Sequence, residues 1–175
     1  AFTPDEKKAY VTISGEGTVS VIVTTTIQVT AKVQQVDYTC WGVAVNPAGT
    51  KVYVANQLST NVSVIDTNTN KVTSTVKAGN SPYEIAFTPD GTKAYVTNSG
   101  ENTVSVIDTT TNTIIATVNV GSSPLGVAVT PDGKKVYVAN EDSNTVSVID
   151  TATNKVTANV CVGTRPVAFG QFIGF

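Results

Sequence analysis

Short runs of hydrophobic residues alternate along this chain with turns made of small and polar residues. The runs are four to six residues long, are rich in valine, isoleucine, threonine and tyrosine, and end at Pro-Asp-Gly, Ser-Gly or Thr-Asn turns. Short runs bounded by turn residues are typical of β-strands, and no stretch has the 3.6-residue hydrophobic period of an amphipathic helix. The pattern therefore predicts an all-β protein.

The same pattern recurs along the sequence every 42 residues. The sequence VSVID at 62–66 returns at 104–108 and 146–150, and the turn TPDG at 88–91 returns at 130–133. A more divergent first copy lies 43 residues upstream of the second. We divide the chain into repeats at about 1–40, 41–82, 83–124 and 125–164, followed by a closing strand at 165–172, in one domain of residues 1–175.

Each repeat contains four expected strands, which in the third copy cover about 83–88, 93–98, 103–108 and 113–119. The turn residues between them favour hairpins, so each repeat is expected to be a four-stranded antiparallel meander. Such a sheet has two apolar faces and must stack on copies of itself. Four strands in about 40 to 45 residues is the period of a β-propeller blade. We therefore predict a β-propeller with four blades in this chain.

The two ends of the sequence suggest how the first blade is completed. Residues 1–4 align with 86–89, so the first blade lacks most of its innermost strand, whereas residues 165–169 align with the start of that strand at 123–127. We expect residues 165–172 to complete the first blade and close a four-bladed ring, which leaves no open edge strand. Half of an eight-bladed dimer and part of a longer propeller are the alternatives.

The motifs of these repeats resemble a known family. YVTN at 95–98, its YVAN variants at 53–56 and 137–140, the TPDG turn and the VSVID strand are similar to the YVTN-type β-propeller repeats of archaeal and bacterial surface-layer and other exported proteins. The resemblance covers essentially the whole chain. It implies a β-propeller located outside the cytoplasm, commonly of about seven blades, whereas this chain supplies four.

Composition removes several classes of function. The chain has no histidine, which excludes histidine general bases, Ser-His-Asp triads and nearly all catalytic zinc sites. Its 11 basic and 13 acidic residues are scattered, so no nucleic-acid partner is expected, and no apolar run is long enough to span a membrane as a helix. The two cysteines, Cys40 and Cys161, have one possible intrachain pairing, and the sequence does not show whether they meet.

Three sets of recurring polar residues invite a functional interpretation. Each aspartate or asparagine ends a strand at a turn, where its side chain can bind free backbone groups, and each tyrosine occupies one position in its blade. We interpret all three sets as structural. They are Asp66, Asp108 and Asp150; Asn56, Asn98 and Asn140; and Tyr10, Tyr53, Tyr95 and Tyr137.

Function is expected where the copies differ, in two sets of loops that share the face around the propeller axis. This loop face combines the only tryptophan with acidic residues, which suits a sugar, a cationic peptide or a loosely held Ca²⁺. The candidate ligand-binding residues are Trp41, Tyr83, Glu84, Glu101, Glu141, Asp142 and Arg165, and Glu16, Gln57, Leu125 and Val167 lie in the same loops. We expect no catalytic residue and no cofactor other than that Ca²⁺.

The leading hypothesis is a non-enzymatic module at the cell surface or outside the cell, which binds protein or carbohydrate as a monomer or homodimer. One alternative is a metal-assisted hydrolase or lactonase that uses loop carboxylates, with Glu16, Glu84, Glu101, Glu141 and Asp142 as candidates. Another is a structural subunit of a surface layer.

Overall fold

The computed structural model describes residues 1–34, 36 and 39–168, and every regular element within them is a β-strand. In chain order the strands are β1 (Lys8–Ile13), β2 (Thr18–Val23), β3 (Gln28–Val33), β4 (Cys40–Val45), β5 (Lys51–Asn56), β6 (Asn61–Asp66), β7 (Lys71–Lys77), β8 (Pro82–Phe87), β9 (Lys93–Asn98), β10 (Thr103–Asp108), β11 (Thr113–Asn119), β12 (Pro124–Val129), β13 (Lys135–Asn140), β14 (Thr145–Asp150) and β15 (Lys155–Cys161).

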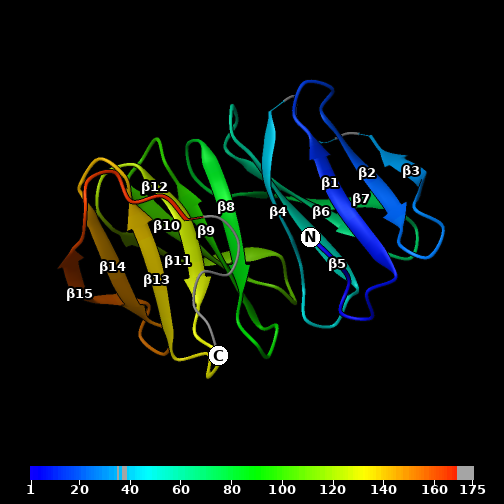
Figure 1. The fold of residues 1–175 in the computed structure, drawn as a ribbon. Coiled ribbons are helices and arrows are strands. Elements are labelled where there is room, and N and C mark those ends of the chain that lie inside the picture. The colour runs from blue at the N-terminus through cyan, green and yellow to red at the C-terminus, as the bar shows by residue number, and fades with distance from the viewer. Residues whose placement is uncertain (35, 37–38, 169–175) are drawn as a thin grey trace.

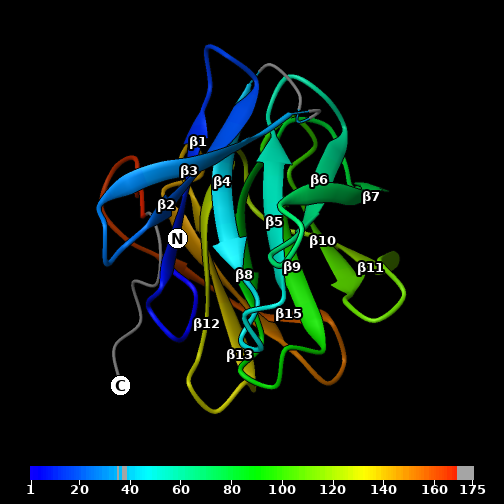
Figure 2. The ribbon, with the colours of Figure 1, turned by 90° about the vertical axis from the view of Figure 1, so that its right-hand side faces the viewer.

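These strands form four antiparallel sheets, each a meander of neighbouring strands (Figures 1 and 2). The first sheet has three strands, β1 to β3, and the other three sheets have four strands each. The all-β propeller fold predicted from the sequence is confirmed. In the third repeat, β9, β10 and β11 have the predicted bounds, and β8 begins and ends one residue earlier than expected.

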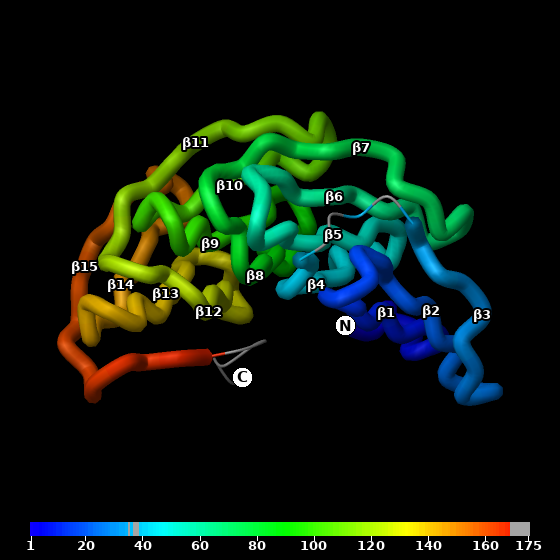
Figure 3. The backbone as a smooth tube through the Cα atoms, turned by 90° about the horizontal axis from the view of Figure 1, so that it is seen from above, coloured from blue at the N-terminus to red at the C-terminus, as the bar shows by residue number. Residues whose placement is uncertain are grey.

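Seen from above, the sheets stand side by side in an arc, with the first and last sheets at its two ends (Figure 3). The first strands of the complete blades, β4, β8 and β12, lie on the inner side of the arc, and β3, β7, β11 and β15 lie on the outer side. The beginnings of the inner strands are therefore brought close together around one axis.

Both faces of the inner sheets are buried, because side chains alternate along each strand and neighbouring sheets cover both sides. Along β5, Val52 and Val54 join the core between the first and second sheets, whereas Tyr53 and Ala55 join the core between the second and third. A third core around Tyr95 fills the space between the third and fourth sheets. Stacking of two-faced sheets is thus what holds the arc together.

Two polar contacts recur at each of the three sheet-to-sheet interfaces. The ammonium groups of Lys8, Lys51 and Lys93 each donate to a threonine carbonyl oxygen of the next sheet at 2.6 Å. The hydroxyl groups of Tyr10, Tyr53 and Tyr95 donate to Asn70, Asn112 and Asn154 of the next sheet at 3.2, 2.6 and 3.2 Å. The tyrosines are packing residues, as predicted, and their hydroxyl groups also fix the register between blades.

These buried tyrosines should make the fold sensitive to alkaline pH. Burial, with a smaller effect of a nearby aspartate, raises the pKa of Tyr10, Tyr53 and Tyr95 from 10.0 to about 12. A phenol whose pKa is higher in the folded state stabilises the fold below pH 10, and this stabilisation is lost as the pH rises from 10 through 12. We expect the free energy of unfolding, measured in urea, to fall across that interval. A triple Tyr→Phe variant at these positions should show a much flatter pH dependence, and an equally steep one would contradict the assignment.

The recurring aspartates are turn residues, which confirms the structural interpretation. Asp66 accepts hydrogen bonds from the backbone N–H groups of Asn68 and Thr69, and Asp108 and Asp150 form the corresponding contacts in their own repeats. The recurring asparagines Asn56, Asn98 and Asn140 are buried at strand ends and donate to serine hydroxyls of the next strand.

The expected closing strand at 165–172 differs from the structure. Its residues 169–172 lie outside the described residues, and residues 165–168 form no strand. The carbonyl oxygen of Ala168 lies against β12, 2.3 Å from the position that a Cβ on Gly126 would take. Residues of the N-terminus lie along β1 instead: Phe2 forms a bridge with Ala9, and Ala1 accepts from the Tyr10 N–H at 2.8 Å. Among the described residues the first sheet therefore has no strand from the tail, and completion of the first blade by residues 165–172 stays a prediction.

The described part of the tail, residues 165–168, begins with the same backbone contacts as the corresponding segment of the preceding repeat. The Arg165 N–H donates to the Asn144 side chain at 2.8 Å, just as the Ser123 N–H donates to Asn102 at 3.0 Å. Arg165 and Ser123 also share a positive φ, of 53° and 52°. Residues 165–168 thus take the position that begins β12 after β11, so they lie beside β12 where the inner strand of a following sheet would lie.

Neither cysteine forms a disulfide. Cys40 is buried at the start of β4, whereas Cys161 is exposed at the end of β15 in the last sheet. Within the described part of the chain, no helix is long and apolar enough to span a membrane.

Candidate ligand-binding site at the axial mouth

Backbone hydrogen bonds bring two sets of loops together at one end of the propeller axis, the end at which the inner strands begin. The N–H groups of Gln57, Ser99 and Glu141, each just after the second strand of a blade, donate to carbonyl oxygens of Thr39, Ser81 and Ser123 at 2.7, 2.9 and 2.9 Å. The accepting residues lie just before the first strand of the same blade. We call this end the axial mouth and define it by Trp41, Tyr83, Glu84, Glu141 and Arg165.

An aromatic pair crosses the boundary between the second and third sheets. The rings of Trp41, on β4, and Tyr83, on β8, are stacked with centroids 5.4 Å apart and planes inclined by 20°. Thr12 of the first sheet donates to the Trp41 carbonyl oxygen at 3.0 Å, which fixes the backbone there. Because 47% of Trp41 is exposed, the pair offers an aromatic surface to solvent.

A charged pair lies near Tyr83. The Arg165 guanidinium binds the Glu141 carboxylate through both Nε, at 2.8 Å, and Nη2. Hydrogen bonding and the charge of Glu141, together with the charge of Asp142, raise the pKa of Arg165, so its positive charge is permanent. Asp142 itself accepts from the Ser123 hydroxyl, which anchors the loop beside the start of β12.

Tyr83 connects the aromatic and charged groups. Burial raises the pKa of its phenol, and the negative charges of Glu141 and Glu84 raise it further. Both carboxylates are therefore close enough to Tyr83 to act on it electrostatically. The neutral phenol remains a hydrogen-bond donor and acceptor at physiological pH.

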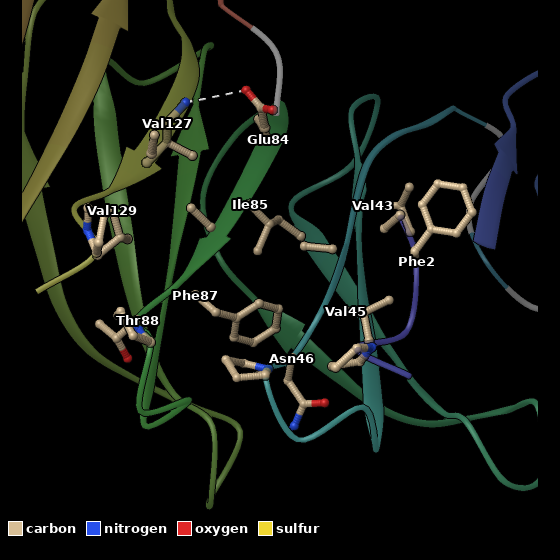
Figure 4. Close-up of a pocket in the computed structure, with 18 of the residues that line it drawn as sticks. Phe2, Val43, Val45, Asn46, Glu84, Ile85, Phe87, Thr88, Val127 and Val129 are labelled. Atoms are coloured by element: carbon tan, nitrogen blue, oxygen red, sulfur yellow. Dashed lines mark hydrogen bonds between the residues drawn. The ribbon is translucent and has the colours of Figure 1, made fainter. Parts of the chain in front are cut away.

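Below the mouth, a groove of about 730 Å³ runs along the inner strands β4, β8 and β12 (Figure 4). Its side chains are mainly apolar, and Figure 4 shows Val43, Val45, Ile85 and Phe87 around it. Glu84 is an acidic residue of its lining, is only 8% exposed, and accepts from the Val127 N–H at 3.3 Å. The corresponding positions of the neighbouring repeats are the glycines Gly42 and Gly126. Glu84 thus belongs to both the mouth and the groove.

The structure brings together six of the seven candidate residues from the sequence: Trp41, Tyr83, Glu84, Glu141, Asp142 and Arg165. Glu101 lies on the loop between β9 and β10, where its carboxylate covers Gly79. The Glu16 carboxylate pairs with Lys32 at 2.9 Å in the first sheet. The apolar groove was not predicted, although its residues follow the candidate positions directly in the inner strands.

The described residues provide no group of side chains suited to binding a metal ion. Among residues 1–34, 36 and 39–168, no three cysteine or carboxylate side chains are grouped so that they could hold a metal ion. The mouth instead combines an aromatic surface, two carboxylates, an arginine and a phenol, which are groups that bind hydroxyl-rich or weakly polar rings.

Comparison with known proteins agrees with the fold. Residues 67–162, more than half of the chain, match the profile of the family described as "Lactonase, 7-bladed beta-propeller". Over 45 residues the chain is 56% identical to the PE-PGRS family protein PE_PGRS18 of Mycobacterium tuberculosis, a match that covers 26% of this chain and 10% of that protein.

Solved structures resemble almost the whole chain. Kuenenia stuttgartiensis hydrazine synthase superposes with a TM-score of 0.88 at 29% identity, over 92% of this chain and 47% of that chain. A functionally unknown protein from Desulfotomaculum acetoxidans gives 0.83 at 23% identity, covering 95% and 56%. A putative 6-phosphogluconolactonase from Bacteroides uniformis gives 0.82 at 20% identity, covering 96% and 55%. The chain therefore spans about half the length of these proteins.

Proposed function

The chain belongs to the lactonase seven-bladed β-propeller family, and from the geometry of the axial mouth we propose that it binds an uncharged sugar-like ring there without transforming it. The stacked pair of Trp41 and Tyr83 carries this proposal. One face of a sugar ring presents C–H groups, which pack on an aromatic surface, and its hydroxyl groups need polar partners at the rim.

The rim of the mouth offers those partners. The Glu141 carboxylate accepts hydrogen bonds, the Arg165 guanidinium donates them, and the Tyr83 phenol does both. Glu141 and Arg165 largely cancel each other's charge, because they form an ion pair. The carboxylates of Glu84 and Asp142 leave the mouth with a net negative charge, which disfavours an anionic ligand. A carbohydrate is accordingly the partner that the mouth fits best, either free or as part of a glycan.

Trp41 provides a direct test, because it is the only tryptophan of the chain. Titration with neutral methyl glycosides should change its emission, and isothermal calorimetry should give the affinity. We expect Trp41→Ala to weaken binding by roughly tenfold, the effect of losing an aromatic contact together with its buried area.

Leu58→Ala is the matched control for this prediction. Leu58 is 79% exposed on the loop between β5 and β6, at the same end of the propeller axis, and has no part in the aromatic pair. Its replacement should leave the affinity unchanged. Equal affinities of wild type and Trp41→Ala, or no response to any neutral glycoside, would refute a ring site at the mouth.

Lactone hydrolysis is the second candidate function, and two observations favour it: the family profile and the two carboxylates close to Tyr83. In this reaction, Glu84 or Glu141 would take a proton from a water whose oxygen attacks the lactone carbonyl carbon. The ring C–O bond would then break, and the proton would pass to the departing alkoxide to give a hydroxy acid.

Turnover of a δ-lactone, corrected for the spontaneous rate, separates the two functions. Loss of turnover in Glu84→Gln or Glu141→Gln would support the hydrolase, and inhibition by a chelator with recovery in Ca²⁺ would support the metal-assisted form. Binding without turnover, unchanged by chelator, supports the binding module.

We place this function at the cell surface or outside the cell, as the similarity of the repeats to those of exported propellers suggests. Cleavage by a protease added to intact cells would support that location, and protection until lysis would oppose it. A structural role in a surface coat would appear as ordered self-assembly at high concentration, whereas a binding module should remain a monomer or homodimer.

A further inference from the structure

We propose that the ligand of the axial mouth carries an alkyl chain, which lies in the apolar groove along β4, β8 and β12. This inference rests on the proposed function and extends it from a ring to a ring with an apolar substituent. Its basis is the direct connection between two chemically different surfaces. Tyr83 belongs to the aromatic pair, and Ile85, two residues on and on the same face of β8, lines the groove.

The groove has the chemistry of a site for an apolar chain. Val43, Val45 and Phe87 are each only partly buried although they are apolar, and together with Ile85 they line the groove (Figure 4). Continuous apolar surfaces that stay accessible to solvent mark binding grooves. The rim above them is polar, so an occupant that fills both parts must itself be amphipathic.

The length of the groove sets the size of the chain. The lining residues of β8 extend from Glu84 to Phe87, three residues on, which at about 3.3 Å per residue of strand is roughly 10 Å. A volume of about 730 Å³ lies within the usual range for small-molecule sites. A medium-length alkyl chain therefore fits without any change in the backbone.

Charge decides which amphiphile is favoured. Glu84 stands at the upper end of the groove, where the head group and the chain would join. Its carboxylate repels the head group of a fatty acid, whereas a glycoside linkage at the same point is neutral. The groove thus favours an alkyl glycoside, or another neutral ring with an alkyl substituent, over a fatty acid.

The test is a chain-length series of methyl, butyl, hexyl and octyl glucoside, each titrated by calorimetry below its critical micelle concentration. We expect affinity to rise about fourfold per added methylene, the value for transfer of a CH₂ group out of water. Octanoate, which has a chain of similar length and a charged head group, should bind more weakly than octyl glucoside.

Two variants assign the effect to the groove. Val45→Asp places a charge in the groove and should abolish the dependence on chain length while leaving binding of methyl glucoside unchanged. The control, Val160→Asp, makes the same substitution at a 48% exposed position on β15. This variant should retain the dependence of affinity on chain length. Equal affinities across the series, or equal effects of the two variants, would overturn the proposal.

The experiments distinguish failure of the proposed ring site at the mouth from failure of the proposed alkyl-chain site in the groove. Binding of methyl glucoside with no gain from longer chains refutes the groove and leaves the ring site intact. Binding of octyl glucoside that is lost in Val45→Asp, without any binding of methyl glucoside, refutes the ring site and leaves the groove. If neither ligand binds, both proposals fall.

Discussion

Replacing Tyr95 with alanine should lower the free energy of unfolding by about 3–5 kcal/mol, the range for removal of a large aromatic side chain from a core. Tyr95 is fully buried between the third and fourth sheets, and its hydroxyl group donates to Asn154. The substitution removes core volume and also leaves the oxygen of the partly buried Asn154 side chain without this donor. Urea unfolding followed by circular dichroism measures the change.

Tyr137 provides the matched control. It occupies the same position in the last repeat, but no further sheet covers it among the described residues, and it is only partly buried. Tyr137→Ala should therefore lower the free energy of unfolding much less than Tyr95→Ala. Similar losses at the two positions would show that the tyrosine stabilises its own sheet and not the interface between blades.

Gly42→Ala should destabilise the protein by about 1–3 kcal/mol, the usual cost of overpacking, and should separate the aromatic pair at the mouth. A Cβ at this position would lie 2.4 Å from the Tyr83 carbonyl oxygen and 2.8 Å from the Glu84 Cα. Both are backbone atoms, so β4 and β8 must move apart. The measurements are the unfolding free energy and the emission spectrum of Trp41.

Gly15→Ala tests whether the effect comes from this close approach. Gly15 lies in the loop between β1 and β2, and a Cβ there would meet no atom within 4 Å. We expect unchanged stability and unchanged Trp41 emission in this variant. If Gly42→Ala behaves in the same way, β4 and β8 are not in close contact at the mouth.

The sequence predicted the strands well, because their limits depend on local chemistry. The Pro-Asp-Gly turns place Gly91 and Gly133 at φ values of 71° and 70°, a conformation that glycine adopts without strain. The aspartates that end strands bind their own turns, so a single repeat contains the information needed to place them. Stacking of the sheets also followed from the sequence, since a meander with two apolar faces has to be covered twice.

Contacts between repeats were harder to predict. The sequence identified Tyr53 as a packing residue, but its acceptor Asn112 lies 59 positions away, and no local pattern connects the two. The loop face was recognised as a set of residues, whereas the stacking of Trp41 on Tyr83 and the pairing of Glu141 with Arg165 depend on side-chain directions. Alignment of the two chain ends suggested closure, but it contained no information about the contact of Ala168 with β12.

The same lysine and tyrosine contacts join every adjacent pair of sheets, so each junction accepts any repeat that keeps those residues in phase. Unequal recombination between copies of the coding sequence would add or delete a whole blade without creating a mismatched interface. Only the variable loops would change partners, which lets such a gene acquire new combinations of surface residues while the folding of its product is preserved.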